Sequence, residues 1–149
     1  MINILKYREI LVELKNKINV RVETQIAGVV IAVSDKHLIK KLKDRTGLLL
    51  CANYPDAESK GGVDNYRDDN RLLLFLLEKV PAGDETDEEE MKHYARIQAV
   101  MQVLKEEVRD MDFVCGEISG ADEISTEWEY DVFGGFNGLS IGLKLTDYD

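Results

Sequence analysis

Six consecutive apolar residues at positions 72–77, Leu-Leu-Leu-Phe-Leu-Leu, constrain the fold of this chain more than any other feature. They lie within the segment 71–80. A strand that is apolar on both faces belongs in the middle of a sheet whose two sides are both covered. We therefore predict a central buried strand over residues 71–80 and a second buried strand over residues 48–52.

Two amphipathic helices are predicted beside these strands. The first covers residues 4–18, where apolar side chains recur at spacings of three and four, namely at Ile4, Tyr7, Leu11, Leu14 and Ile18. The second covers residues 87–109 and has the same period. Thr86 and Glu89 form a capping box at its start, among acidic residues that suit the positive end of a helix dipole.

The segment between the first helix and residues 48–52 allows two interpretations. β-Branched residues are frequent over 26–33, and Ser34 and Asp35 are suited to cap a short helix over 36–45 that stops at Gly47. This pattern favours a strand followed by a short helix. A buried helix over residues 23–33 fits the apolar spacing nearly as well.

The last third of the chain switches to a period of two, which predicts two strands that each have one buried and one solvent-facing side. We assign the buried side of the first to Ile124, Thr126, Trp128, Tyr130 and Val132. The second strand alternates over residues 139–145. Asn137-Gly138 lies between them and tolerates the positive φ angles of a tight turn, so an antiparallel hairpin is predicted.

The order of these elements indicates a single α+β domain over residues 1–149. We expect a mainly antiparallel sheet that is packed by the N-terminal helix and the long helix and that ends in a β-hairpin. No internal repeat, interdomain linker or low-complexity tract is present in the sequence.

Charge excludes one large class of partners. The chain has 19 Lys and Arg and 29 Asp and Glu, a net charge of −10, which argues against direct nucleic-acid binding because phosphates are neutralised by basic residues. The first nine residues interleave charge with apolar side chains, unlike a signal peptide. The longest nearly uncharged stretch, 24–34, is far shorter than the ~20 residues of a membrane span. We expect a cytoplasmic protein without membrane contact.

No catalytic, metal-binding or cofactor-binding residues are predicted, and no small-molecule substrate is identified. His37 and His93 are expected on exposed helix surfaces, away from any nucleophile motif. The acidic residues at 64, 68 and 69 lack the spacing of a calcium loop and are interpreted as part of a solvated loop. Cys51 and Cys115 are interpreted as buried free thiols.

The candidate site residues instead suggest contacts with proteins. The solvent side of the first C-terminal strand presents an acidic set, Glu127, Glu129 and Asp131, which either binds a basic partner or repels unwanted strand pairing. Phe133 and Phe136 flank glycines at the predicted hairpin tip, where either a partner covers them or they fold back over the open end of the core.

A long polar connection supplies two further candidates. Residues 53–70 show no apolar period, and a connection of this length is usually functional or poorly ordered. Tyr54 and Tyr66 bracket it, and loops that become ordered only on assembly commonly carry such tyrosines.

This organisation resembles that of small α+β proteins of tailed phages and prophages which form tail-terminator or tail-completion rings. The shared features are the N-terminal helix, the strand pair 48–52 and 71–80 with its long polar connection, the helix 87–109 and the final strand pair. The ending 129–141 is also similar to the ends of proteins from prophage-like elements.

The resemblance implies a non-enzymatic structural protein that forms a homo-oligomeric ring, has no cofactor and becomes associated with a virion. The polar connection and the hairpin tip would then be contact surfaces, and ring closure requires two different complementary patches. The alternative is an acidic cytoplasmic adaptor or inhibitor that binds a basic protein through its acidic strand face.

Overall fold

The computed structural model describes residues 1–80, 85–110, 116–118 and 123–148 of the chain. Its helices and strands follow in the order α1 (Ile4–Asn19), β1 (Ile26–Ala32), α2 (Asp35–Leu42), β2 (Leu48–Asn53), β3 (Asp56–Lys60), β4 (Arg67–Lys79), α3 (Asp87–Asp110), β5 (Gly116–Ile118), β6 (Ser125–Val132) and β7 (Phe136–Tyr148).

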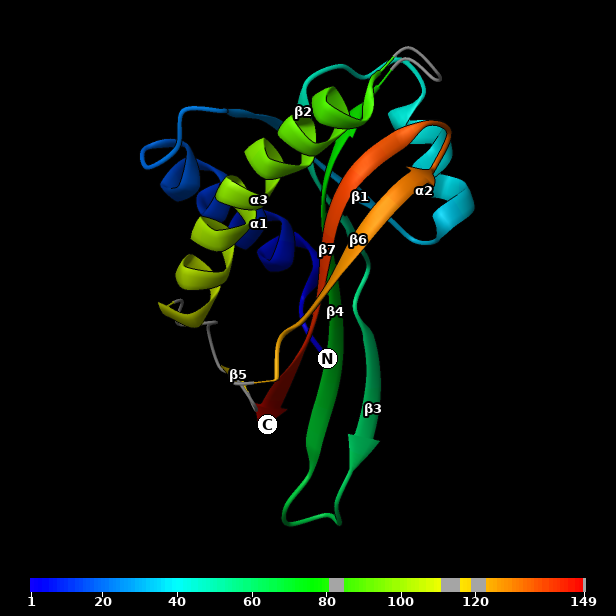
Figure 1. Cartoon of the computed structure of the whole chain (residues 1–149). Helices are drawn as coiled ribbons and strands as arrows, with labels where there is room; N and C mark the ends of the chain where they lie inside the picture. The colour runs from blue at the N-terminus through cyan, green and yellow to red at the C-terminus, as the bar shows by residue number, and fades with distance from the viewer. Residues whose placement is uncertain (81–84, 111–115, 119–122, 149) are drawn as a thin grey trace.

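All the described strands belong to one sheet (Figure 1). Its main order is β1-β2-β4-β7-β5, with β3 paired to the first half of β4 and β6 paired to β7. β1 and β2 are parallel, and every other pair is antiparallel. The predicted α+β architecture, with a mainly antiparallel sheet and a final β-hairpin, is confirmed.

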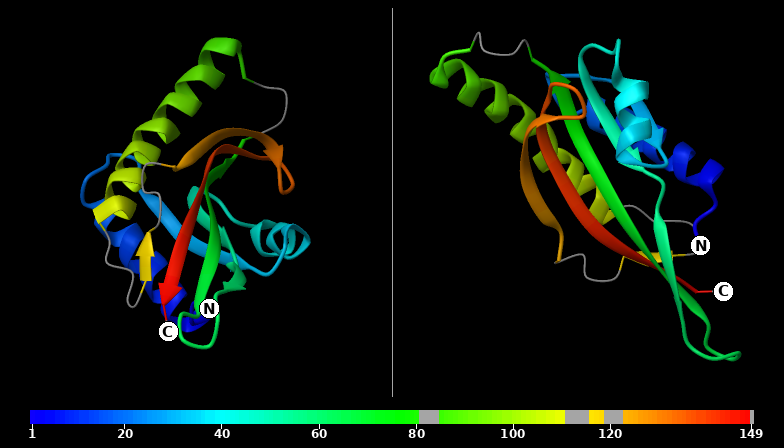
Figure 2. Two further views of the ribbon diagram at one scale, coloured as in Figure 1. Left: turned by 90° about the horizontal axis from the view of Figure 1, so that it is seen from below. Right: turned by 90° about the vertical axis from the view of Figure 1, so that its right-hand side faces the viewer.

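β4 lies in the middle of the sheet and is apolar on both faces, as the run 72–77 predicts. Leu72, Leu74 and Leu76 pack in the larger core beneath α1 and α3. Phe75 and Leu77 point to the opposite face and pack in a smaller core beneath α2. The strands lie between α2 on one side and α1 with α3 on the other in the left view of Figure 2.

Both amphipathic helices begin and end within one residue of their predicted limits. The Thr86 hydroxyl accepts a 3.2 Å hydrogen bond from the Glu89 amide and so caps α3. Residues 26–32 form a strand, which decides between the two interpretations of that segment. The short helix that follows ends at Leu42, three residues earlier than predicted.

The polar connection 53–70 is a β-hairpin, which corrects the prediction of a long loop. β3 and the beginning of β4 pair along five residues each, and residues 61–66 form the turn. The Asn65 side chain accepts a 2.7 Å bond from the Gly62 amide. Gly61 has φ +101°, and a Cβ at this position would lie 2.1 Å from the Asn65 carbonyl oxygen, so the turn requires glycine.

The turn of the C-terminal hairpin is displaced from its predicted place. It comprises Phe133, Gly134 and Gly135, all with positive φ. Asn137 and Gly138 lie instead within β7. A Cβ on Gly138 would come within 1.8 Å of the Leu76 carbonyl oxygen, so this glycine permits the close approach of β7 to β4.

The predicted buried side of β6 is not buried. Trp128 and Tyr130 retain 59% and 71% of their accessible surface, and only Ile124 and Val132 of the predicted set are half-buried. Among the described strands, β6 pairs with β7 alone and so forms an edge of the sheet. Alternation identifies the residues that share a face, but here only Tyr94 of α3 packs on Trp128, and most of that face stays exposed.

Candidate functional site

A projecting hairpin, which we call the arm, comprises residues 56–71 of β3 and β4. It extends beyond the helices at one end of the molecule (Figures 1 and 2). All five residues of β3 are exposed, and of the described strands β3 pairs only with β4, so one edge of the arm is open. An open, exposed strand edge is a surface on which another chain can pair.

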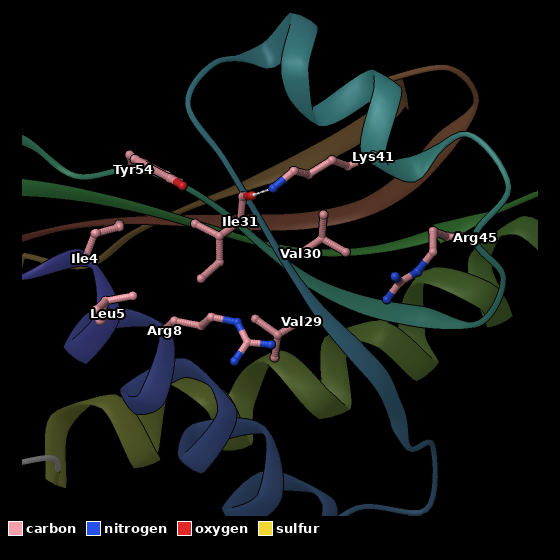
Figure 3. A pocket seen from close by; sticks show the side chains of 9 residues that line it. All are labelled: Ile4, Leu5, Arg8, Val29, Val30, Ile31, Lys41, Arg45 and Tyr54. Atoms are coloured by element: carbon pink, nitrogen blue, oxygen red, sulfur yellow. Dashed lines mark hydrogen bonds between the residues drawn. The ribbon is translucent and has the colours of Figure 1, made fainter.

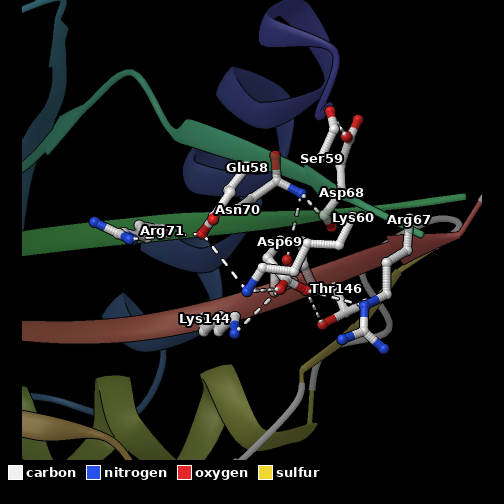
Figure 4. A network of polar contacts seen from close by, with 11 residues as sticks. Glu58, Ser59, Lys60, Arg67, Asp68, Asp69, Asn70, Arg71, Lys144 and Thr146 are labelled. Carbon is white, nitrogen blue, oxygen red and sulfur yellow. Dashed lines mark hydrogen bonds and ion pairs between the residues drawn. The ribbon is translucent and has the colours of Figure 1, made fainter. Parts of the chain in front are cut away.

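A buried carboxylate fixes the arm to the sheet (Figure 4). Asp69 is only 3% exposed, and its Oδ2 lies 3.2 Å from the ammonium groups of both Lys60 and Lys144. Its Oδ1 accepts a 3.1 Å hydrogen bond from the Thr146 hydroxyl. These contacts connect β3, β4 and β7. Burial opposes ionisation, but the bonds from Lys60, Lys144 and Thr146 outweigh it and lower the Asp69 pKa to about 2.

The opposite face of the arm has its own polar contacts. Asp68 accepts bonds from the Met1 amino group and from the Ser59 hydroxyl, and these contacts lower the pKa of Asp68. Ser59 also bonds the Tyr66 hydroxyl at 2.9 Å. Asp68 and Asp69 are therefore buried members of a network, which corrects the prediction of a solvated loop, while Asp64 is exposed.

A pocket of about 370 Å³ lies along the free edge of β1, which we call the edge pocket (Figure 3). Its apolar part is formed by Ile4, Leu5, Val29, Val30 and Ile31. Its charged residues are all basic and come from both sides of the sheet. Arg8 belongs to α1, Lys41 belongs to α2, and Arg45 follows α2.

The three cations of the edge pocket lack acidic partners. Within the described part of the chain, no carboxylate forms an ion pair with Arg8, Lys41 or Arg45, and no acidic residue lines the pocket. The Lys41 ammonium donates instead to the Ile31 carbonyl oxygen at 2.6 Å. In a chain of net charge −10, this pocket is a locally basic region, which favours the approach of negatively charged groups.

The two tyrosines that bracket residues 53–70 are not brought together. Tyr54 lines the edge pocket, whereas Tyr66 is the last residue of the turn of the arm. Each keeps 40% of its surface exposed. The two tyrosines therefore lie on two separate surfaces. The strands of the arm pair with each other in the single chain, without a partner protein.

The acidic candidates lie along the β6 edge, which we define as residues 125–132. Glu127 and Asp131 are exposed, while Glu129 is half-buried and accepts a 2.7 Å bond from the Ser140 hydroxyl. Beside them, Trp128 packs edge-to-face on Tyr94 with ring centres 5.7 Å apart. This edge thus combines carboxylates with accessible aromatic rings.

The two phenylalanines fold back over the core. Phe136 is 1% exposed and belongs to the smaller core, and Phe133 is half-buried and packs edge-to-face on Phe75 at 5.1 Å. This arrangement matches the second of the two interpretations of the hairpin tip. Phe136 presents almost no surface to a partner.

Neither histidine is exposed, which corrects the prediction for both. His93 is buried, with Nε2 3.4 Å from Glu78 Oε1, and this oxygen also accepts a 2.6 Å bond from Arg96. His37 is half-buried and accepts a 3.2 Å bond from the Val33 amide. His93 lies four residues before Ile97, so both side chains are on the apolar side of α3. This spacing is the feature of the sequence from which burial of His93 could be predicted.

Cys51 is a buried free thiol, as predicted, and burial raises its pKa to about 12. Cys115 lies outside the described residues. Among the residues that the structure describes, no group of three or more His, Cys, Asp or Glu side chains is arranged to hold a metal ion. None of the described helices has the length and apolar composition of a membrane span.

No protein-family model, curated protein or solved structure matches this chain.

Proposed function

We propose that this chain is a non-enzymatic structural protein that assembles with further copies of itself, as the subunits of tail-terminator or tail-completion rings do. The observation that carries this proposal is the arm. Its fully exposed strand β3 extends away from both cores, where it contributes no buried apolar surface to the fold. A projecting strand of this kind stabilises an assembly when a neighbouring subunit packs against it.

The arm is suited to such a contact because its conformation is fixed in advance. A two-stranded hairpin alone is marginally stable in water. Here residues 67–71 of β4 also pair with β7, and Asp69 connects β3 to β7 through Lys60 and Lys144. An ordered arm loses less conformational entropy on binding than a flexible loop does, which favours association.

Light scattering during size-exclusion chromatography tests this proposal. We expect the mass of an oligomer, which is 16.9 kDa multiplied by the number of its subunits, and rings in negative-stain electron microscopy. A protein that remains a monomer across a hundredfold range of concentration overturns the proposal.

A shortened arm tests the contribution of its tip. Replacement of residues 61–66 by Asn-Gly joins Lys60 to Arg67 through a two-residue turn and retains their pairing. We expect this variant to fold with all Asp69 contacts and to assemble less strongly. Assembly equal to that of the unmodified chain would assign the subunit contact to another surface.

The β6 edge supports the adaptor as a second candidate function. Glu127 and Asp131 are accessible beside exposed aromatic rings, a combination that suits a basic protein partner. In that case the chain is monomeric, and charge reversal at Glu127, Glu129 and Asp131 weakens binding of the basic partner in a salt-dependent way. Unchanged affinity of that partner would exclude the adaptor.

A further inference from the structure

We propose that the edge pocket of one subunit receives the β6 edge of a second copy of this chain, so that the sheet continues from subunit to subunit. This inference rests on the proposed self-assembly and identifies a second contact between subunits, in addition to that of the arm. β1 and β6 lie at opposite edges of the sheet, and in the part of the chain that the structure describes each has a partner strand on one side only. A β6 to β1 contact would therefore leave the sheet of each subunit intact.

The main chain of β1 has groups available for this pairing. The Ala32 carbonyl points toward β2, since it accepts a bond from the Tyr54 amide. Because successive carbonyls alternate in direction along a strand, those of Ile31 and Val29 point to the free edge. In the single chain the Lys41 ammonium donates a hydrogen bond to the Ile31 carbonyl. Lysines are common at sheet edges that are protected from pairing with other chains.

The charges of the two edges are complementary. The edge pocket contributes Arg8, Lys41 and Arg45 without an acidic residue. The β6 edge contributes Glu127, Glu129 and Asp131. On docking, the Lys41 ammonium leaves the Ile31 carbonyl and binds a carboxylate of β6 instead. The Ile31 carbonyl can then accept a hydrogen bond from a main-chain amide of β6.

The two edges also match face by face. Glu127 pairs with Ser140 and Ser140 with Phe75, so Glu127 lies on the face covered by α2. Lys41 of α2 and Arg45 next to it lie on that same face. In a continuous sheet that keeps its faces aligned, the carboxylates of β6 meet these two cations.

The opposite face brings aromatic rings to apolar surface. Trp128 pairs with Leu139, which belongs to the core beneath α1 and α3, so Trp128 and Tyr130 lie on the α1 face. In the neighbouring subunit this face presents Leu5, which is 73% exposed, and Arg8. Burial of these rings supplies the apolar part of the contact, and Arg8 adds a cation–π interaction.

One existing bond defines the paired segment. The Tyr94 hydroxyl donates to the Glu129 carbonyl at 2.7 Å. Because the Glu129 carbonyl is already bonded to α3, residues 125–128 are the part of β6 that pairs with β1 through the main chain. Glu129 and Asp131 contribute their side chains to the contact. Since the two docking surfaces differ, the contact is head-to-tail and closes into a ring when the rotation between subunits allows it.

Charge-reversed variants test this docking. One variant carries Lys41→Glu with Arg45→Glu, and the other carries Glu127→Lys with Glu129→Lys. We expect each variant alone to associate at least about tenfold more weakly, whereas an equimolar mixture assembles because each kind of edge again meets its opposite. Lys40→Glu is the matched control, since Lys40 is exposed on α2 but lies outside the pocket.

Carbodiimide cross-linking of the unmodified chain provides an independent test that requires no variant to fold. In a mixture of ¹⁴N and ¹⁵N subunits, mass spectrometry should find amide links between Lys41 of one label and Glu127 or Glu129 of the other. The docking is overturned if the unmodified chain forms an oligomer without these links and the mixture of the two charge-reversed variants stays dissociated. Self-assembly itself would still stand in that case. A monomer at every concentration overturns both.

Discussion

The ammonium group of Lys41 lies 2.6 Å from the carbonyl oxygen of Ile31, so a side chain of α2 occupies the free edge of β1. In the proposed assembly this lysine both protects the edge in the single subunit and binds a carboxylate of the incoming strand. Its positive charge, rather than its aliphatic stem, is then the essential property.

Substitution of Lys41 by methionine separates the charge from the stem. We expect Lys41→Met to weaken self-association and to reduce its dependence on salt, because one charge pair is lost at the interface. Sedimentation velocity at low and high salt measures both effects. Lys40→Met is the control, and an equal loss of association in the control would show that only the total charge matters.

The ion network of the arm predicts a pH dependence of stability. Its contacts lower the Asp69 pKa from its ordinary value of 3.8 to about 2, so the ionised carboxylate stabilises the folded state at neutral pH. This contribution is lost as the pH falls from about 4 to about 2. Asp69→Asn should therefore destabilise the protein at pH 7, and its difference from the unmodified chain should diminish through this acidic range.

Urea unfolding at a series of pH values measures that difference. Asp56→Asn removes an acidic charge from the same hairpin at an exposed position and serves as the control. If the two variants unfold at the same urea concentration at pH 7, the Asp69 network does not stabilise the arm.

Gly138 is expected to be irreplaceable in β7. A Cβ there would lie 1.8 Å from the Leu76 carbonyl oxygen, and only a shift of the two central strands would relieve this contact. Gly138→Ala should reduce the free energy of unfolding by at least about 2 kcal/mol. In the control Gly62→Ala, the added Cβ lies at an ordinary 3.5 Å from its nearest neighbour, and this variant should unfold close to the unmodified chain.

The single tryptophan provides a direct signal of the proposed interface. Trp128 is 59% exposed in the isolated subunit and should become buried when β6 docks. We expect its fluorescence emission to shift to shorter wavelength, and its quenching by iodide to decrease, as the protein concentration rises through the assembly transition. Assembly without either change would place the interface away from β6.

Apolar periodicity accounts for what the sequence predicts correctly. The run 72–77 predicts burial on two faces, and all its residues except Leu73, which is 38% exposed, pack in the cores. The stripe from Ile4 to Ile18 predicts burial on one face, and its residues pack in or against the larger core. Apolar periodicity does not predict the strands of the arm, because neither face of the arm is apolar. Like charges lie directly opposite each other in the pairs Glu58–Asp69 and Lys60–Arg67, and the favourable contact is the diagonal one between Lys60 and Asp69. No local charge pattern therefore predicts the pairing of these strands.

The edge pocket and the exposure of β6 depend on tertiary structure. Arg8, Val29 and Lys41 are distant in sequence and meet only because α1 and α2 lie on opposite faces of β1. Likewise, alternation places Trp128 and Tyr130 on one face, but only the position of β6 at the edge determines that this face stays open. Local sequence patterns carry no information about which element covers a strand.

Sedimentation velocity of the unmodified chain over a wide range of concentration tests the central claim, self-assembly, most directly. We predict a discrete larger species whose mass is a fixed multiple of 16.9 kDa, with subunits released on dilution. A single species of 16.9 kDa at every concentration would contradict the account.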